Sequence, residues 1–258
     1  HGHSIESVRP QTVSLNNAKV SKIAAGPKNS ACICENNEVY FWGEVFWMQF
    51  GAQKSKQVYE KPESVKLEFG VTDIALGEKH NLYLTENKTL VTMGAEGVEF
   101  LENEFEQVEG VEFTEVACFR DSFFALAQNG TLYTWSKHSE DPGNLGRLVD
   151  EDHPLSVPLE VSSQEFYQSN DSKGPEEVKF QKSSQATAIF CGSENTLLVT
   201  NSGEVLVSGS NRFGQLGIAH GDVESDASSE DPFGEDYEYQ TFQYISRLSL
   251  ANNLKVEK

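Results

Sequence analysis

The side chains that could do chemistry in this chain of 258 residues do not assemble into a known catalytic motif. The sequence contains no glycine-rich phosphate loop, no dinucleotide fingerprint, no GxSxG nucleophile turn and no HExxH zinc motif. Its carboxylates are so numerous that close pairs of them carry no information. We therefore predict that the protein is not an enzyme and has no catalytic residues, no cofactor and no metal site.

The cysteines could bind a metal or form disulfides, but their spacing favours neither. They are Cys32, Cys34, Cys118 and Cys191, and none of them belongs to a CxxC pair. Cys32 and Cys34 would share one face of a strand, which is weak evidence for a metal. We interpret all of them as small buried hydrophobic residues in a reducing compartment.

The histidines give an equally weak signal. His1 and His3 could bind copper or nickel, but we interpret residues 1–4 as a remnant of a purification tag. His138, His153 and His220 lie in or beside expected loops and pair with no cysteine motif.

The charge excludes some partners. The chain has 20 Lys and Arg against 40 Asp and Glu, a net charge of -20, which argues against a broad surface for nucleic acid or anionic membranes. No apolar run approaches the roughly 18 residues of a membrane-spanning helix, and no signal peptide is apparent at the start. We expect an intracellular protein, in the cytoplasm more than in the nucleus.

Part of the acidity is concentrated in one segment, residues 222–238, which we call the acidic strip. It contains no Lys or Arg, and eight of its 17 residues are acidic. The strip is either a solvated loop or a docking segment for a basic partner, with Ser228 and Ser229 open to phosphorylation. The acidic residues are Asp222, Glu224, Asp226, Glu230, Asp231, Glu235, Asp236 and Glu238.

A repeat organises the elements that would position these residues. Residues 23–43, 74–94, 116–136 and 189–209 align without a gap. The first position is β-branched in every copy, and the fourth is glycine except at Phe119. Between two apolar runs lie turn residues such as Asn36-Asn37 and Ser202-Gly203, which tolerate positive φ. Each copy is therefore predicted to be a β-hairpin with a two-residue turn of a primed type.

A fourth strand per repeat is also expected. Short apolar stretches precede each hairpin, for example at Val65 and Leu67, so four strands per copy is the natural count. Repeats of about 40–50 residues with four strands are blades of a β-propeller. Longer spacing in the third copy indicates an insertion at about 147–185, and a second insertion spans about 219–241; both are expected at the surface.

These repeats resemble those of the RCC1 (regulator of chromosome condensation) family, with a pattern of approximately V-x-x-I-A-C-G-x-x-H-T-L-A-L-T-x-x-G-x-V-Y-x-W-G-x-N-x-x-G-Q-L-G. The best local matches are residues 71–85, 39–43 and 209–217. The histidine of the pattern is present as His80 and is replaced in the other copies by Asn29, Ser122 and Asn195. The chain is thus identified as a divergent member, in which the resemblance implies a structural hydrogen-bonding role for His80.

The resemblance implies an all-β fold, a propeller of four-stranded antiparallel blades over residues 5–258. Four hairpin cores are fewer than the family's usual seven blades, so we expect an incomplete ring of about four to five blades. Further blades would come from the same protein or from a partner chain, because open sheet edges invite aggregation. A compact ring of five smaller blades is the other possibility.

The resemblance also implies the function: a non-enzymatic propeller that binds proteins, as a scaffold or regulatory module of a larger signalling or trafficking protein. The alternative is guanine-nucleotide exchange on a small GTPase, the founding activity of the family, which leaves no portable motif. Chromatin binding would need basic segments, which are not apparent.

One departure from the family pattern suggests a contact site. Where the family has a polar turn, this chain has Phe46-Trp47-Met48. Phe46 and Trp47 either pack locally between blades or form an exposed anchor for a partner, since aromatic residues dominate binding hot spots.

Overall fold

The fold is all-β, as predicted, and is described by a computed structural model. The described residues are 12–46, 49–50, 56–94, 97–101, 105–120, 122–136, 145–146, 156, 158–161, 167–168, 176–177, 185–192, 194–211, 213–217 and 238–244. Within these ranges, no helix has the length and apolar character needed to cross a membrane.

Four sheets follow one another along the chain, all antiparallel except for one strand pair in the last, and we call them blades 1 to 4. Blade 1 contains β1 (Val20–Ala25), β2 (Asn29–Cys34), β3 (Val39–Phe46) and β4 (Lys56–Val65). Blade 2 contains β5 (Val71–Leu76), β6 (Asn81–Thr85), β7 (Leu90–Gly94) and β8 (Gly97–Phe100). Blade 3 contains β9 (Phe113–Phe119), β10 (Ser122–Ala127), β11 (Leu132–Ser136) and β12 (Leu159–Glu160), and the 3-10 helix η1 (Glu106–Val108) precedes it.

Blade 4 has the same plan with an added pair of strands. Its main strands are β15 (Ala186–Cys191), β16 (Asn195–Thr200), β17 (Val205–Ser210) and β18 (Glu238–Tyr244). On the outer side, β13 (Tyr167–Gln168) pairs parallel with β18, and β14 (Glu176–Glu177) pairs with β13. Thus β12, β13 and β14 lie in the stretch expected to be the first insertion, and the start of β18 lies in the second.

The predicted count of four strands per blade is confirmed, but the fourth strand lies elsewhere. We call the first strand of a blade its inner strand and the fourth its outer strand. Each aligned segment contains the end of the inner strand and the hairpin formed by the second and third strands, and the outer strand follows the hairpin. Val65 is therefore the last residue of an outer strand, β4, and belongs to the blade before the hairpin it precedes. The apolar pattern alone could not show whether a stretch is the last strand of one blade or the first strand of the next.

The hairpin turns differ from the predicted two-residue type. Asn37 N donates to Cys34 O at 2.9 Å and Cys34 N donates to Glu38 O at 2.9 Å, which closes a three-residue loop. Among the loop residues, positive φ occurs at the third, with 62° at Asn37 and 64° at Lys88. This is a type I turn followed by a left-handed residue, and it explains why asparagine or glycine suits that position.

The core lies in the seams between blades. Along an inner strand, alternate residues face opposite seams, as the two-residue period of a strand requires. Ile74 packs in the seam with blade 1, and the next residue, Ala75, packs in the seam with blade 3. Val116 and Ile189 repeat the position of Ile74 in the next two seams. The repeated β-branched position is thus the residue that each blade inserts against the blade before it.

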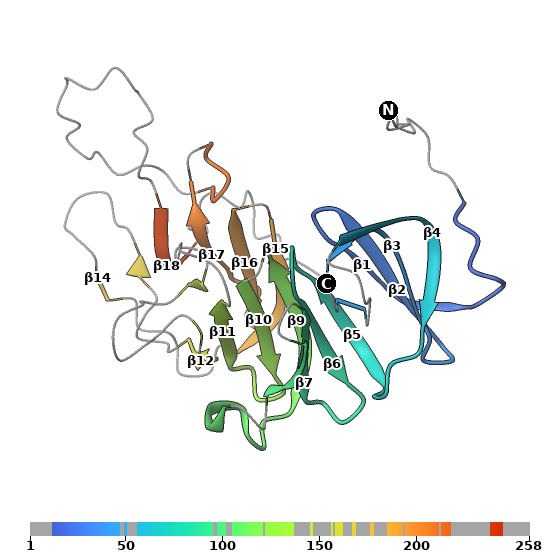
Figure 1. The fold of residues 1–258 in the computed structure, drawn as a ribbon. Coiled ribbons are helices and arrows are strands. Elements are labelled where there is room, and N and C mark those ends of the chain that lie inside the picture. Colours follow the sequence, from blue (N-terminus) through green and yellow to red (C-terminus); the bar gives the residue numbers. More distant parts are fainter. Residues whose placement is uncertain are drawn as a thin grey trace.

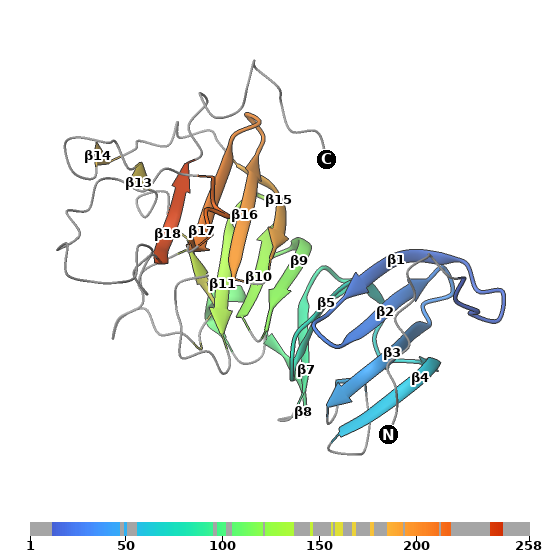
Figure 2. The same cartoon turned by 90° about the horizontal axis from the view of Figure 1, so that it is seen from above.

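The blades form an arc. Figure 1 shows the sheets in chain order, from blue β1–β4 to orange and red β15–β18, and the inner strands β1, β5, β9 and β15 contact one another in sequence. Figure 2, seen from above, also places blade 1 and blade 4 at opposite ends of the described sheets. The described residues therefore form part of a propeller and leave its first and last blades without a neighbouring blade on one side.

Candidate protein-binding surface

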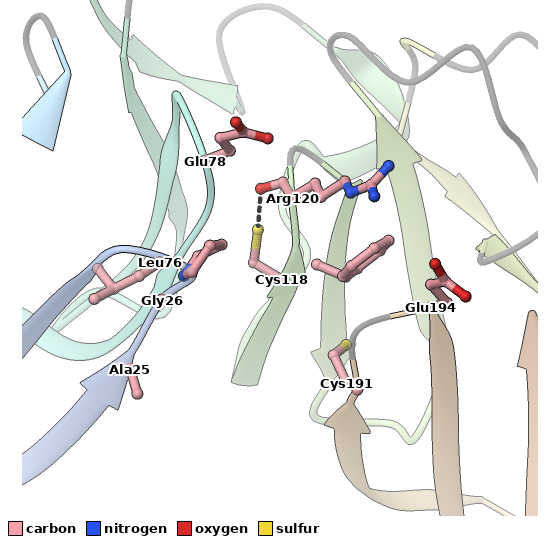
Figure 3. Close-up of a pocket in the computed structure, with 11 residues that line it drawn as sticks. Ala25, Gly26, Leu76, Glu78, Cys118, Arg120, Cys191 and Glu194 are labelled. Atoms are coloured by element: carbon pink, nitrogen blue, oxygen red, sulfur yellow. Dashed lines mark hydrogen bonds between the residues drawn. The ribbon is translucent and has the colours of Figure 1, made fainter. Parts of the chain in front are cut away.

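The turns that join the first and second strands lie at the same end of all four blades and gather there. They enclose a hollow of about 390 Å³, which we call the axial hollow (Figure 3). Blade 1 contributes Ala25, Gly26 and Pro27, and blade 2 contributes Leu76 and Glu78; blade 3 contributes Cys118, Phe119 and Arg120, and blade 4 contributes Cys191, Gly192 and Glu194. Each blade thus supplies the same short stretch of its repeat.

The glycines at the fourth repeat position allow these turns to close. A Cβ on Gly26 would lie 2.3 Å from Asn29 Oδ1, and one on Gly192 would lie 2.3 Å from Asn195 Oδ1. The side chain three residues later therefore occupies the space that a Cβ would need, which only glycine leaves free. In blade 3, Phe119 takes the glycine position and the small Ser122 takes the place of the asparagine.

The turns of blades 2 and 3 are tied together at the hollow. Glu78 N donates to Arg120 O at 2.8 Å, and Cys118 Sγ donates to the same oxygen at 3.1 Å. A Cβ on Gly77 would lie 2.3 Å from Arg120 O, so these two turns approach as closely as backbone allows. Arg120 has a positive φ of 49°, which turns its carbonyl toward blade 2.

The charged and aromatic groups at the hollow come from different blades. The guanidinium of Arg120 lies over the Phe119 ring, with its carbon 5.2 Å from the centroid. Figure 3 shows Glu78 on one side of Arg120 and Glu194 on the other. The hollow therefore offers two carboxylates, one cation and one aromatic face to a bound segment.

The Cys191 thiol at the hollow is poorly suited to nucleophilic chemistry. Burial raises the pKa of Cys191 to about 12, against the opposing effect of a hydrogen bond with Thr196. A thiol with this pKa is almost wholly protonated at neutral pH, whereas the thiolate is the nucleophile. None of the four cysteines forms a disulfide; Cys32 and Cys34 are buried and the other two are half-buried. In the part of the chain that the structure describes, no group of three or more His, Cys, Asp and Glu could hold a metal.

The candidate residues chosen from the sequence either do not line the axial hollow or lie outside the described residues. Phe46 is the last residue of β3 and pairs with Lys56 at the start of β4. Trp47 and the acidic residues between 222 and 236 lie outside the described residues, while Glu238 begins β18. His80, chosen as a structural residue, is buried against Gly94, where a Cβ would lie 2.0 Å from its ring.

Sequence reasoning missed the axial hollow, although the repeat contained its signal. The first repeat position carries nearly the same residue in every copy, but the fifth carries Pro27, Glu78 and Arg120 in the first three. Positions that differ among otherwise matched copies are free of the packing that fixes the seams. Comparing the four copies at each repeat position, and selecting the positions where the residues differ, would have indicated this end of the blades.

Comparison with known proteins identifies the repeat. Residues 186–215 match the Regulator of chromosome condensation (RCC1) repeat. The chain is 28% identical to human E3 ubiquitin-protein ligase HERC2 over 233 residues, which is 84% of this chain and 4% of that protein. It is 23% identical to the ultraviolet-B receptor UVR8 of Arabidopsis thaliana over 85% of this chain and 48% of the receptor. The chain thus spans less than half the length of these relatives.

Solved structures support the same fold. The structure of human WBSCR16 superposes with a TM-score of 0.64 at 20% identity, covering 93% of this chain and 56% of that chain. The Saccharomyces cerevisiae protein Prp20p, described together with its binding to Gsp1p and histones, superposes with a TM-score of 0.62 at 16% identity, covering 93% of this chain and 53% of that one.

Proposed function

We propose that this chain, which folds as propeller blades and matches the RCC1 repeat at residues 186–215, is a non-enzymatic module that binds protein partners within a larger intracellular signalling or trafficking protein. One observation carries the proposal: the axial hollow presents a different set of side chains from each of four otherwise matched blades. A rigid scaffold with variable loops at one end is a common arrangement for recognition.

The chemistry of the axial hollow suggests what a partner presents. Glu78 and Glu194 would attract a cationic side chain, and Phe119 and Leu76 offer apolar surface beside it. Arg120 would pair with a carboxylate of the same partner. The net charge of -20 would speed the approach of a basic segment.

Partner capture from cell extract, followed by mass spectrometry, tests the proposal. The test variant is Glu78→Lys/Glu194→Lys, and the control is Glu63→Lys, which reverses an exposed carboxylate on the outer strand β4. We expect a set of proteins that the wild type and the control retain and the test variant loses. If all three chains capture the same proteins, the axial hollow does not bind them.

The acidic strip is a second proposed contact, independent of the axial hollow. Its eight carboxylates would make binding to a basic partner strongly salt-dependent. Neutralising Asp222, Glu224, Asp226 and Glu230 together should weaken the affinity for a captured partner and flatten its salt dependence. An affinity that does not change would mean that the acidic strip is a solvated loop and does not contact the partner.

The aromatic pair Phe46 and Trp47 stays a proposed partner anchor. Phe46→Ala and Trp47→Ala should each reduce partner binding without lowering the melting temperature if the pair is exposed for recognition. A lower melting temperature with every partner still bound would assign the pair to local packing.

Guanine-nucleotide exchange remains the alternative function, and similarity to Prp20p, whose structure was described with its binding to Gsp1p, gives a reason to test it. Exchange would require the chain to bind the nucleotide-free form of a small GTPase more tightly than the loaded form. Release of a fluorescent nucleotide from a panel of small GTPases measures this directly. Acceleration of one GTPase would favour exchange, and no acceleration would favour the binding module.

A further inference from the structure

Phe213 has the most exposed of the large apolar side chains among the described residues, at 82%. It lies in the loop after β17, two residues before Gln215. Trp47 lies two residues before Gln49, the equivalent glutamine of blade 1, and is outside the described residues. An aromatic residue thus occupies the same repeat position in both blades, and in blade 4 its ring is in solvent.

The loop that carries Phe213 is fixed by hydrogen bonds of its own. Phe213 N donates to Gln215 Oε1 at 2.8 Å, and Gln215 Nε2 donates to Ser210 Oγ at 3.2 Å. Asn211 is buried, and its Oδ1 accepts a hydrogen bond from the backbone of the buried Leu216 at 3.0 Å. Because the loop is already ordered, a partner that covers the ring loses little affinity to the ordering of this loop.

The same loop begins at the wall of the axial hollow. Ser210 N donates to the backbone oxygen of Glu194 at 2.8 Å, and Glu194 lines the hollow. Phe213 is three residues further along, so its Cα lies within about 11 Å of the Cα of Ser210, the reach of three extended residues. A partner interface of standard size, about 800 Å² per side, is wide enough to cover both the ring and the hollow.

The ring and the hollow have opposite shapes and different chemistry. Phe213 protrudes and is apolar, whereas the hollow is recessed and carries Glu78 and Glu194. A protruding ring is removed from water only by a concave apolar surface, and a linear peptide has no such concavity. The matching surface therefore has an apolar pocket beside a protruding cationic side chain, and only a folded protein holds both in place.

We propose that the partner of the axial hollow is a folded domain, which takes Phe213 into an apolar pocket and places a lysine or arginine side chain in the hollow against Glu78 or Glu194. This partner class rests on the proposed function, since it requires the hollow to bind proteins. Phe213 is its anchor, in line with interfaces in which a few residues carry most of the binding energy.

Affinity measurements with a captured partner test the proposal. A protein that the wild type captures and Glu78→Lys/Glu194→Lys loses is purified and titrated against each variant. Phe213→Ala should weaken its affinity by about 30-fold or more, as the loss of a hot-spot residue does. The melting temperature of this variant should equal that of the wild type, because the ring is exposed. Val58→Ala, at an exposed valine of the outer strand β4, is the matched control and should bind like the wild type.

The outcomes separate this proposal from the function on which it rests. If Phe213→Ala binds as tightly as Val58→Ala, the anchor is wrong while protein binding at the hollow stands. A lower melting temperature of Phe213→Ala means that the ring packs within this chain, and it also overturns the anchor. If no captured protein depends on Glu78 and Glu194, the proposed function fails and the partner class fails with it.

Digestion of the same partner distinguishes a folded domain from a linear segment. The partner is denatured and cleaved after its glutamate residues, which destroys any pocket and leaves its basic segments intact. The folded partner should bind the wild type, and the digest should not. A digest that keeps the affinity of the folded partner means that the hollow recognises a linear basic segment, which overturns the proposal and leaves the proposed function standing.

Discussion

Gln49 and Asn81 exchange hydrogen bonds across the seam between blades 1 and 2. Gln49 Nε2 donates to Asn81 Oδ1 at 3.3 Å, and Asn81 Nδ2 donates to the backbone oxygen of Gln49 at 3.0 Å. Tyr83 donates its hydroxyl to the same oxygen at 2.6 Å. Both amide side chains are buried, so this polar contact fixes how one blade sits on the next.

Replacing Gln49 by leucine should destabilise the chain by about 1–3 kcal/mol, because Gly77 O and Asn81 Oδ1 would lose this donor while buried. Chemical denaturation measures the change. Gln215→Leu is the control, since that amide is half-buried and bonds within its own blade, and its cost should stay below that of Gln49→Leu. An equal loss of stability in Gln49→Leu and Gln215→Leu would contradict a stabilising role for the Gln49 hydrogen bonds across the seam.

Adding a methyl group at Gly94 should create a clash with His80. A Cβ there would lie 2.0 Å from His80 Cδ2 and 2.6 Å from Cγ, so Gly94→Ala should cost about 1–3 kcal/mol. Removing the ring relieves the clash, and a double-mutant cycle with His80→Ser should therefore show strong coupling. Additive effects would mean that the two residues do not touch.

The pair Lys22 and Asp73 links the inner strands of blades 1 and 2. Lys22 Nζ lies 2.5 Å from Asp73 Oδ2, and the Asp73 side chain is nearly buried while the Lys22 side chain is half-exposed. Lys22→Met should cost about 1 kcal/mol, because a nearly buried carboxylate loses its cation. Lys19→Met, which removes a lysine paired with Glu35 at an exposed site, should cost less. The cost at Lys22 should also shrink at high salt.

Alkaline conditions should weaken the fold through Cys191. Its pKa is raised from 9.0 to about 12 in the folded chain, so folding favours the protonated thiol. Below pH 9 the thiol is protonated in both states and the stabilisation is complete; between pH 9 and 12 the unfolded chain ionises first and stability falls. Denaturation midpoints across this range should fall less steeply for Cys191→Ala than for the wild type. Parallel curves would rule out this thiol as a contributor.

Much of the fold could be predicted from the sequence because the repeat is a packing pattern. Ile74, Val116 and Ile189 mark the inner strands since each fills the same place in successive seams. The turn type was missed because the residue that needs positive φ, such as Asn37 or Gly130, is the same in a two-residue and a three-residue loop. The loop length depends on which backbone groups pair, and side-chain patterns do not encode that.

The candidate binding surface could be predicted far less well. The sequence directed attention to composition, namely the acidic strip and the aromatic pair, whereas the axial hollow is made by turns from four distant segments. Arg120 and Glu194 are 74 positions apart and become neighbours through strand order alone. A search for local motifs has no means of joining them.

The order of strands has a consequence for how the chain is made. In blades 1 to 3, every strand pairs with the one before it in the sequence, so each sheet can complete its hydrogen bonds before the next one leaves the ribosome. In blade 4, β13 and β14 are synthesised before the main strands, yet β13 pairs with β18, the last to appear. This sheet can therefore complete its hydrogen bonds only after the most C-terminal described strand has been made, so we expect blade 4 to finish folding later than blades 1 to 3.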